Sequence, residues 1–366
     1  MAELKATGKT SVALSFLKEN CMPHWRFPAE WEPQDAVLLA WPHAGTDWAE
    51  RLDAVEDTFV ALVGAIASFQ PVLLCTAGEA VRARAQSRLA DAAVPLEAVR
   101  FIDIDYDDTW LRDSGPITLR DADGAPHFLD FRFTGWGGKF GASRDDALIA
   151  GLAARGVLAA DAVERVDFAL EGGAIETDGR GTLLSTWRCL SERHPQLTRV
   201  QVTEVLRTEL RQQRVLWLEH GYLEGDDTDA HVDTLARLVP DDGIVFQACD
   251  DPADAHHAEL AAMAAELAEL RTADGRPYRL FPLPWPQPVR DAGRRLAASY
   301  ANFLIINGAV LMPAYGDPAD VTAAAVLAQA FPDRQIVPVP CRALIWQNGS
   351  LHCLTMQIPQ GALTHG

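Results

Sequence analysis

The chain has 366 residues, of which 48% are hydrophobic and 23% are charged. This composition is typical of a folded globular protein and argues against disorder, and the length suits one large α/β domain or two average domains. The formal net charge of −19 argues against a nucleic-acid or membrane partner, because anionic surfaces are bound by basic faces, and it favours small cationic molecules.

The six cysteines are scattered along the chain, and none of them forms a CxxC pair. This spacing supports neither a zinc knuckle nor a disulfide framework, so we expect a cytoplasmic location. A short apolar run at 12–17 is followed by charged residues, which is typical of neither a signal peptide nor an anchor. A fragment at 8–10 that ends like a phosphate-binding loop lacks the required upstream glycine.

Apolar runs alternate with amphipathic stretches from residue 36 onward. Buried strands are predicted at 36–41, 72–75 and 99–104, and helices starting near Thr46 and Glu79 lie between them. Later strands are predicted at 128–133, 163–170, 182–186, 215–218, 231–239, 244–247 and 303–306, and helices at 196–212, 255–270 and 319–330. This alternation predicts an α/β fold.

Two polar loops after strands carry candidate site residues. The loop at 109–116 combines an aromatic residue, Trp110, with both charges, including Asp113, and binding sites are usually built on such loops. A surface turn with a local ion pair is the alternative. At 171–173, two glycines follow Glu171 and allow the backbone to come close beside that carboxylate.

The most polar stretch, at 224–233, places several acids around His231. It lacks the spacing of a calcium-binding EF-hand, and a single histidine makes a poor zinc site, so we expect no metal. The segment from His231 is predicted to be a strand. His231 and Asp233 then lie on the same face, because strand side chains alternate, and the pair can converge on one cavity.

The last segment, 348–358, starts with an Asn-Gly turn signal and continues as an alternating run, which predicts a strand. Cys353 then shares a face with Thr355 and Gln357, whereas His352 falls on the opposite, apolar face as a core histidine. A base for a Cys353 nucleophile must therefore come from elsewhere. The alternative is that Cys353 is a small buried hydrophobe.

The spacing of these candidates suggests an internal repeat. Asp113 and Glu171 are 58 positions apart, Glu171 and His231 are 60 apart, and His231 and Cys353 are 122 apart, which is about twice that interval. A divergent α/β repeat that directs one loop per unit at a common centre would give this spacing. Coincidence is the alternative, because the units show no residue-level similarity.

Seven short motifs occur along the chain, at 27–33, 110–116, 135–139, 171–173, 227–233, 299–303 and 352–353. In this order they resemble the motifs of agmatine deiminases and of their bacterial peptidylarginine deiminase relatives, over nearly everything from Phe27 onward. The resemblance implies a pentein-type fold, a fivefold pseudosymmetric α/β propeller with the site on its axis. It also implies a single catalytic domain at 23–366 after an N-terminal extension at 1–22.

The resemblance also assigns roles to the candidates. It makes Cys353 the nucleophile and His231 the general acid/base, and it places Trp110 along the substrate channel. The remaining residues, Asp113, Glu171 and Asp233, are assigned to the guanidinium, which carboxylates can accept in bidentate fashion.

The expected reaction is hydrolysis of agmatine to N-carbamoylputrescine and ammonia through an amidino-thioether on the cysteine. It requires no metal or organic cofactor. Self-association as a homo-oligomer is left open. This chain departs from the family at three positions near the site, since Ser350, Ala230 and Thr234 replace the more frequent Asn, Gly and Asn.

Two alternatives are retained. The same fold could be a binding module with a defunct site, although a pure binder needs no nucleophile. It could also deiminate free arginine or peptidyl-arginine. Agmatine is expected to be preferred because Asp226, Asp227 and Asp229 would repel an α-carboxylate and attract a second positive charge. Arg112 is discounted as a carboxylate partner because on an extended segment it would point away from the site.

Overall fold

The computed structural model describes residues 25–364, so the expected extension at 1–22, including the run at 12–17 and the fragment at 8–10, lies outside the described residues. Among the described helices, none is long and apolar enough to cross a membrane.

Five sheets in the described chain repeat one topology. In each, the first strand is antiparallel to the second, the third is parallel to the second, and a helical segment connects the second to the third. Written in the order first strand, second strand, helix, third strand, the units are β18 (Met356–Pro359), β1 (Gln34–Ala40), α2 (Leu52–Ala67), β2 (Val72–Thr76); β4 (Ile117–Arg120), β5 (Pro126–Arg132), α6 (Leu148–Ala154), β6 (Val163–Ala169); β7 (Ile175–Thr177), β8 (Thr182–Thr186), α7 (Trp187–Arg193) with α8 (Arg199–Glu209), β9 (Arg214–Leu218); β10 (Ala236–Val239), β11 (Gly243–Gln247), α9 (His257–Glu269), β12 (Arg279–Leu283); and β15 (Leu304–Ile306), β16 (Ala309–Ala314), α10 (Ala319–Ala330), β17 (Gln335–Pro340).

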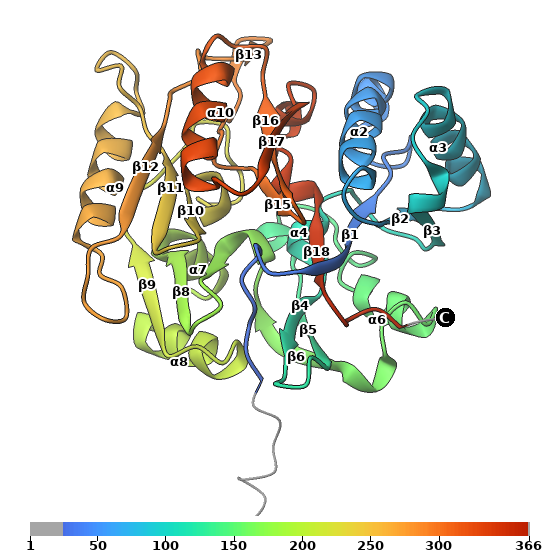
Figure 1. Cartoon of the computed structure of the whole chain (residues 1–366), viewed down its shortest axis with the longest axis horizontal. Helices are drawn as coiled ribbons and strands as arrows, with labels where there is room; N and C mark the ends of the chain where they lie inside the picture. Colours follow the sequence, from blue (N-terminus) through green and yellow to red (C-terminus); the bar gives the residue numbers. More distant parts are fainter. Residues whose placement is uncertain (1–24, 365–366) are drawn as a thin grey trace, which may run out of the picture.

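Both ends of the chain contribute to the first sheet, because the C-terminal strand β18 pairs with β1. This sheet also extends through α3 (Glu79–Asp91) to β3 (Val99–Asp103). A small hairpin of β13 (Arg290–Asp291) and β14 (Arg294–Arg295) stands apart from the five units. In Figure 1 the longer helices lie toward the outside of the molecule and the strands lie nearer its centre.

Hydrophobic patterning explains these elements. Strand β2 is buried along its whole length, as expected for a strand covered on both faces. Helix α2 buries Val55, Phe59, Leu62 and Ile66, which recur at helical spacing and form one apolar face. Helix α8 begins with a capping box in which Thr198 and Gln201 satisfy each other's backbone N–H groups.

Four of the five units begin with a short helical turn just before the first strand. These turns are α4 (Leu111–Ser114), η4 (Gly172–Ala174), η5 (Val232–Thr234) and η7 (His352–Leu354). In the fifth unit, a bend around Tyr300 and Ala301 stands in the same place before β15. The repeat predicted from the spacing is therefore confirmed, and it directs one turn per unit toward the site.

The structure corrects two strand predictions. Residues 351–355 do not continue a strand, because η7 ends just before β18, and residues 231–235 contain η5 before β10 begins. In the first case, a side chain replaces the ladder, since Asn302 Oδ1 accepts the N–H groups of His352 and Cys353 at 3.0 and 3.4 Å. Local alternation cannot reveal such a tertiary partner. The helix predicted at 319–330 matches α10.

Candidate active site

A cavity of about 830 Å³ reaches the turns α4 and η7. Trp110, Asp113 and Cys353 line it. The other predicted site residues, Glu171, His231 and Asp233, lie behind this wall and are at most 1% exposed. The structure thus brings all six candidates into one region, three of them on the cavity surface.

Gly173 marks the point where the candidate side chains meet. A Cβ atom there would lie 2.6 Å from His231 Nδ1, 2.8 Å from Asp113 Oδ1 and 3.1 Å from Asp233 Oδ2. Only glycine fits without displacing them. The Gly173 N–H also donates to Asp113 Oδ1 at 3.0 Å. The predicted close backbone approach beside a carboxylate is therefore confirmed.

The Cys353 thiol is held by an amide and a carboxylate. Asn302 Nδ2 donates to Sγ at 3.2 Å, and Asp233 Oδ2 lies 3.7 Å from Sγ. Burial, reinforced by the nearby Asp233 and Asp113, raises the pKa of the Cys353 thiol well above its usual value. The resting thiol is therefore protonated, and an arriving cation would favour its ionisation.

Asn302 was not among the predicted site residues, although a signal for it existed. The interval of 122 positions between His231 and Cys353 leaves one repeat without a candidate. Asn302, just before β15, fills that gap and binds both the thiol and the backbone of η7.

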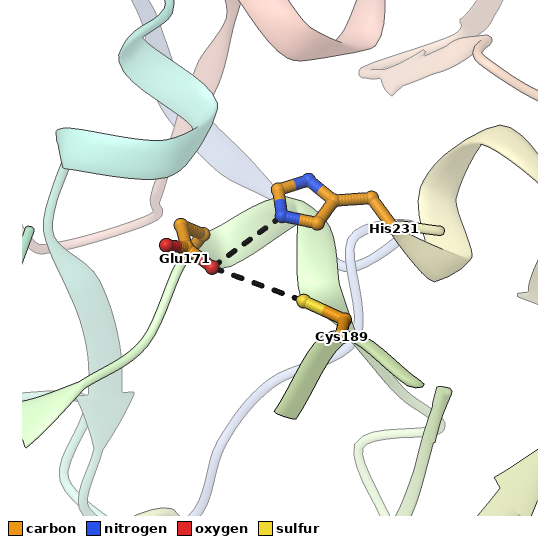
Figure 2. A group of neighbouring side chains, drawn as sticks. All are labelled: Glu171, Cys189 and His231. Atoms are coloured by element: carbon orange, nitrogen blue, oxygen red, sulfur yellow. Dashed lines mark hydrogen bonds and ion pairs between the residues drawn. The ribbon is translucent and has the colours of Figure 1, made fainter. Parts of the chain in front are cut away.

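His231 is fully buried between two carboxylates (Figure 2). Its Nε2 lies 3.5 Å from Glu171 Oε2 and its Nδ1 lies 3.7 Å from Asp113 Oδ1. These separations are too long for good hydrogen bonds, and both ring nitrogens are without a partner in the described structure. Burial disfavours the imidazolium, but Asp113, Cys189 and Glu171 outweigh it and raise the pKa of His231 well above its usual value.

Asp113 is oriented by two donors from different elements. Trp136 Nε1 donates to Oδ2 at 2.9 Å, and the Gly173 N–H binds Oδ1. Burial raises the pKa of Asp113 to about 6, although His231 and Trp136 act to lower it. Trp136 belongs to the glycine-rich turn α5 (Gly135–Gly138), and the sequence gave no indication that it reaches the site.

Glu171 is paired with an arginine that the sequence did not single out. Arg193 Nε donates to Glu171 Oε1 at 2.7 Å, and Arg193 NH1 donates to Asp229 Oδ2 at 2.6 Å. Burial opposes ionisation of Glu171, but His231 and Arg193 lower its pKa. Glu171 is therefore a carboxylate, with Oε2 directed away from Arg193 and toward His231.

His352 is buried, as expected for a core histidine, but its surroundings are ionic. Its Nδ1 lies 2.7 Å from Asp233 Oδ2, and its Nε2 lies 2.7 Å from Glu30 Oε2 and 3.0 Å from an Arg237 nitrogen. His352 and Cys353 thus reach the same oxygen of Asp233, so the prediction that they face opposite ways is wrong. The helical turn η7, rather than an extended strand, explains this convergence.

Two further residues behave as the sequence suggested, though for different reasons. The ring of Trp110 packs against Gly349, where a Cβ atom would lie only 2.3 Å from the ring. Arg112 does not line the cavity; it donates to Gln357 Oε1 at 2.7 Å and faces Glu30 at 3.5 Å. It points away because α4 is a helical turn, not because the segment is extended.

The acids around His231 have separate tasks. Asp226 accepts from the backbone of Thr228 and Ala230 and so closes its own loop. Asp229 is paired with Arg193 and with Lys139, whose Nζ lies 2.6 Å away. Of the three acids predicted to repel a carboxylate, only Asp227 lines the cavity. Glu171, Cys189 and His231 form a separate group whose geometry could hold a metal ion.

Comparisons with known proteins agree with this arrangement. The family model of Porphyromonas-type peptidyl-arginine deiminase matches residues 26–359. The chain is 36% identical to the agmatine deiminase of Stutzerimonas stutzeri (strain A1501) over 360 residues, which cover 91% of this chain and 95% of that protein.

Solved structures give the same result. A putative arginine deiminase from Porphyromonas gingivalis superposes with a TM-score of 0.85 and 45% identity, covering 93% of this chain and 100% of that one. A cysteine-to-serine variant of the C. jejuni agmatine deiminase with substrate bound gives 0.84 and 34%, covering 92% and 97%. The expected pentein-type fold is confirmed, and the chain belongs to the Porphyromonas-type peptidyl-arginine deiminase family.

Proposed function

We propose that this protein is an agmatine deiminase, which hydrolyses the guanidinium group of agmatine to N-carbamoylputrescine and ammonia through a covalent intermediate on Cys353. One observation carries the proposal. Beside the thiol, three fully buried polar atoms are without a partner: Asp233 Oδ1 and both ring nitrogens of His231. Unsatisfied buried polar atoms are costly, so their concentration in one place supports a polar ligand there.

A guanidinium ion fits this set of atoms. It is planar and cationic, and its N–H groups can donate to carboxylates on two sides. In this proposal, Asp113, Glu171 and Asp233 accept those N–H groups, and Trp110 lines the approach. The cation also supplies the positive charge that the buried Cys353 thiol requires in order to ionise.

The reaction then proceeds in two halves. The Cys353 thiolate attacks the central guanidinium carbon and forms a C–S bond, and charged His231 donates a proton to the departing ammonia. Neutral His231 next accepts a proton from water, which attacks the amidino-thioether. The C–S bond breaks, the thiolate leaves, and a ureido product is released. The raised pKa of His231 suits the first proton transfer, because the ring starts out charged.

The charge around the cavity supports agmatine as the substrate. Its lining contains two cations, Lys139 and Arg294, against seven carboxylates: Asp47, Glu50, Asp107, Asp108, Asp113, Asp145 and Asp227. Burial raises the pKa values of Asp108 and Asp145 to about 7, and the remaining five acids still outnumber the cations. Such a lining attracts the second positive charge of agmatine and disfavours the α-carboxylate of arginine.

One observation favours arginine as a second candidate substrate. Arg294 lines the cavity and donates to Asn348 Oδ1 at 2.9 Å, but the described structure gives it no carboxylate partner. An α-carboxylate could occupy that position.

Ammonia release should therefore be measured with agmatine, free arginine and an arginyl peptide in parallel, with Arg294→Gln as a matched variant. The proposal predicts the highest kcat/KM for agmatine and little change in that value for Arg294→Gln. A kcat/KM for arginine equal to or above that for agmatine, and lost in Arg294→Gln, would establish arginine instead. No ammonia from any of the three would favour the binding module.

A further inference from the structure

We propose that Glu171, Cys189 and His231 form an inhibitory site for a thiophilic divalent cation, with Zn²⁺ as the best fit. The three residues supply a carboxylate oxygen, a thiol sulfur and an imidazole nitrogen, which is a donor set that zinc prefers. Cys189 has no part in the proposed reaction, so the site uses a residue that catalysis leaves free.

The distances suit a small tetrahedral ion. Glu171 Oε2 lies 3.5 Å from His231 Nε2 and 3.9 Å from Cys189 Sγ, and all three donor atoms lie within 4.8 Å of one another. Bonds of about 2.0–2.3 Å to a tetrahedral zinc ion place its ligand atoms roughly 3.3–3.8 Å apart. A small inward movement of Cys189 therefore completes three-ligand coordination. Figure 2 shows Glu171 Oε2 directed at both of the other side chains.

The donor atoms are available. His231 is fully buried and Nε2 has no hydrogen-bond partner, so a ligand there would satisfy an otherwise unpaired atom. Arg193 occupies Glu171 Oε1 and leaves Oε2 free. The positive charge of Arg193 would repel a cation, but Asp229 pairs with that arginine and Asp113 lies 3.7 Å from the His231 ring. Carboxylates therefore surround the site.

Occupation of this site would stop turnover. A metal bound at Nε2 prevents His231 from exchanging protons there, and it engages the carboxylate proposed to hold the guanidinium. His231 and Cys189 are fully buried, so the ion must enter through the acidic cavity and pass the wall formed by Asp113 and Cys353. Inhibition should therefore develop slowly, and bound substrate should protect against it. Only the inhibition rests on the proposed function; the binding of metal does not.

The test is a titration of the full-length protein with Co²⁺ and Zn²⁺ alone, without substrate. Bound Co²⁺ should show a thiolate-to-metal absorption band that Zn²⁺ abolishes. Cys189→Ser should lose the band and bind Zn²⁺ at least about 100-fold more weakly, while keeping its ammonia release and losing its sensitivity to Zn²⁺. Cys353→Ala should retain the band. Cys189→Ala serves as the second variant where the serine protein does not fold.

The outcomes are decisive in each direction. A band that persists in both Cys189 variants and disappears in Cys353→Ala would show that the ion binds the nucleophile, and it would overturn the proposal. Stoichiometric binding that produces no thiolate band would also overturn it. Metal binding by an inactive protein would support the site while removing the proposed function, so the two failures are distinguishable.

Discussion

The two buried histidines near Cys353 occupy similar places yet differ in one respect. His231 and His352 both belong to turns that precede a first strand, and each lies between two carboxylates. The ring nitrogens of His352 lie 2.7 Å from their carboxylate oxygens, whereas those of His231 lie 3.5 and 3.7 Å away and have no hydrogen-bond partner.

This difference separates positioning from chemistry. A histidine with both nitrogens engaged is fixed in orientation and fixes its partners, so His352 holds Asp233 in place beside the thiol. A histidine with both nitrogens free can still exchange protons with a substrate or a water. The comparison assigns proton transfer to His231 on contacts alone, and each prediction below tests part of that assignment.

The largest effect is expected for Cys353→Ser, because the comparison has meaning only if this sulfur reacts. Turnover should fall by at least about 10⁴-fold, since the hydroxyl has no accessible anionic form near neutral pH. The variant should retain the circular dichroism spectrum and Tm of the parent. Residual turnover within tenfold of the parent would remove Cys353 from the reaction.

His231→Ala should lower kcat by about 10²–10⁴-fold, the usual contribution of a positioned acid or base. The measurement is steady-state ammonia release by a variant whose fold has been checked by circular dichroism. Partial rescue by added imidazole would support the role, because a small base can enter the space left by the side chain. A folded His231→Ala protein with full activity would rule out this residue as the base.

His352→Ala should lower kcat/KM by up to about 10²-fold, because Asp233 loses the contact that orients it. This replaces the expectation that the residue matters mainly for packing. His352→Asn is the matched variant, since its amide can still donate to Asp233, and it should recover most of the activity. Equal losses in the two variants, with equal drops in Tm, would return His352 to a purely structural role.

The smallest effect is expected in the pH profile. Asp113 has a pKa of about 6 in the free protein and must be ionised to bind a guanidinium, so kcat/KM should fall as the pH drops through about 6. Trp136 donates to Asp113 and lowers its pKa, so Trp136→Phe should move this acidic limb to higher pH. A limb that stays in place in Trp136→Phe would assign it to another group.

The sequence supports the fold better than it supports the details of the site. The alternation of strands and helices and the 60-residue interval reflect the units directly, because each depends on local pattern. Asn302, Arg193 and Trp136 act through contacts with residues far away in the chain, at 51, 22 and 23 positions respectively. Local periodicity carries no information about such pairs.

The position of His352 shows the same limit. The strand prediction placed it on an apolar face, since Leu354, Met356 and Ile358 follow at alternate positions. The turn η7 instead exists because Asn302 binds its backbone, and this rotates His352 toward Asp233 and Glu30. A single tertiary hydrogen-bond acceptor therefore decides the role of this residue.

The most direct test of the central claim is to detect the covalent intermediate. The protein would be mixed with agmatine, quenched in acid within milliseconds to seconds, and analysed by intact and peptide mass spectrometry. The account predicts a mass increase equal to agmatine less ammonia on the peptide that contains Cys353, with no adduct in Cys353→Ser. An adduct on Cys75, Cys189, Cys249 or Cys341, or turnover at full rate without any adduct, would contradict it.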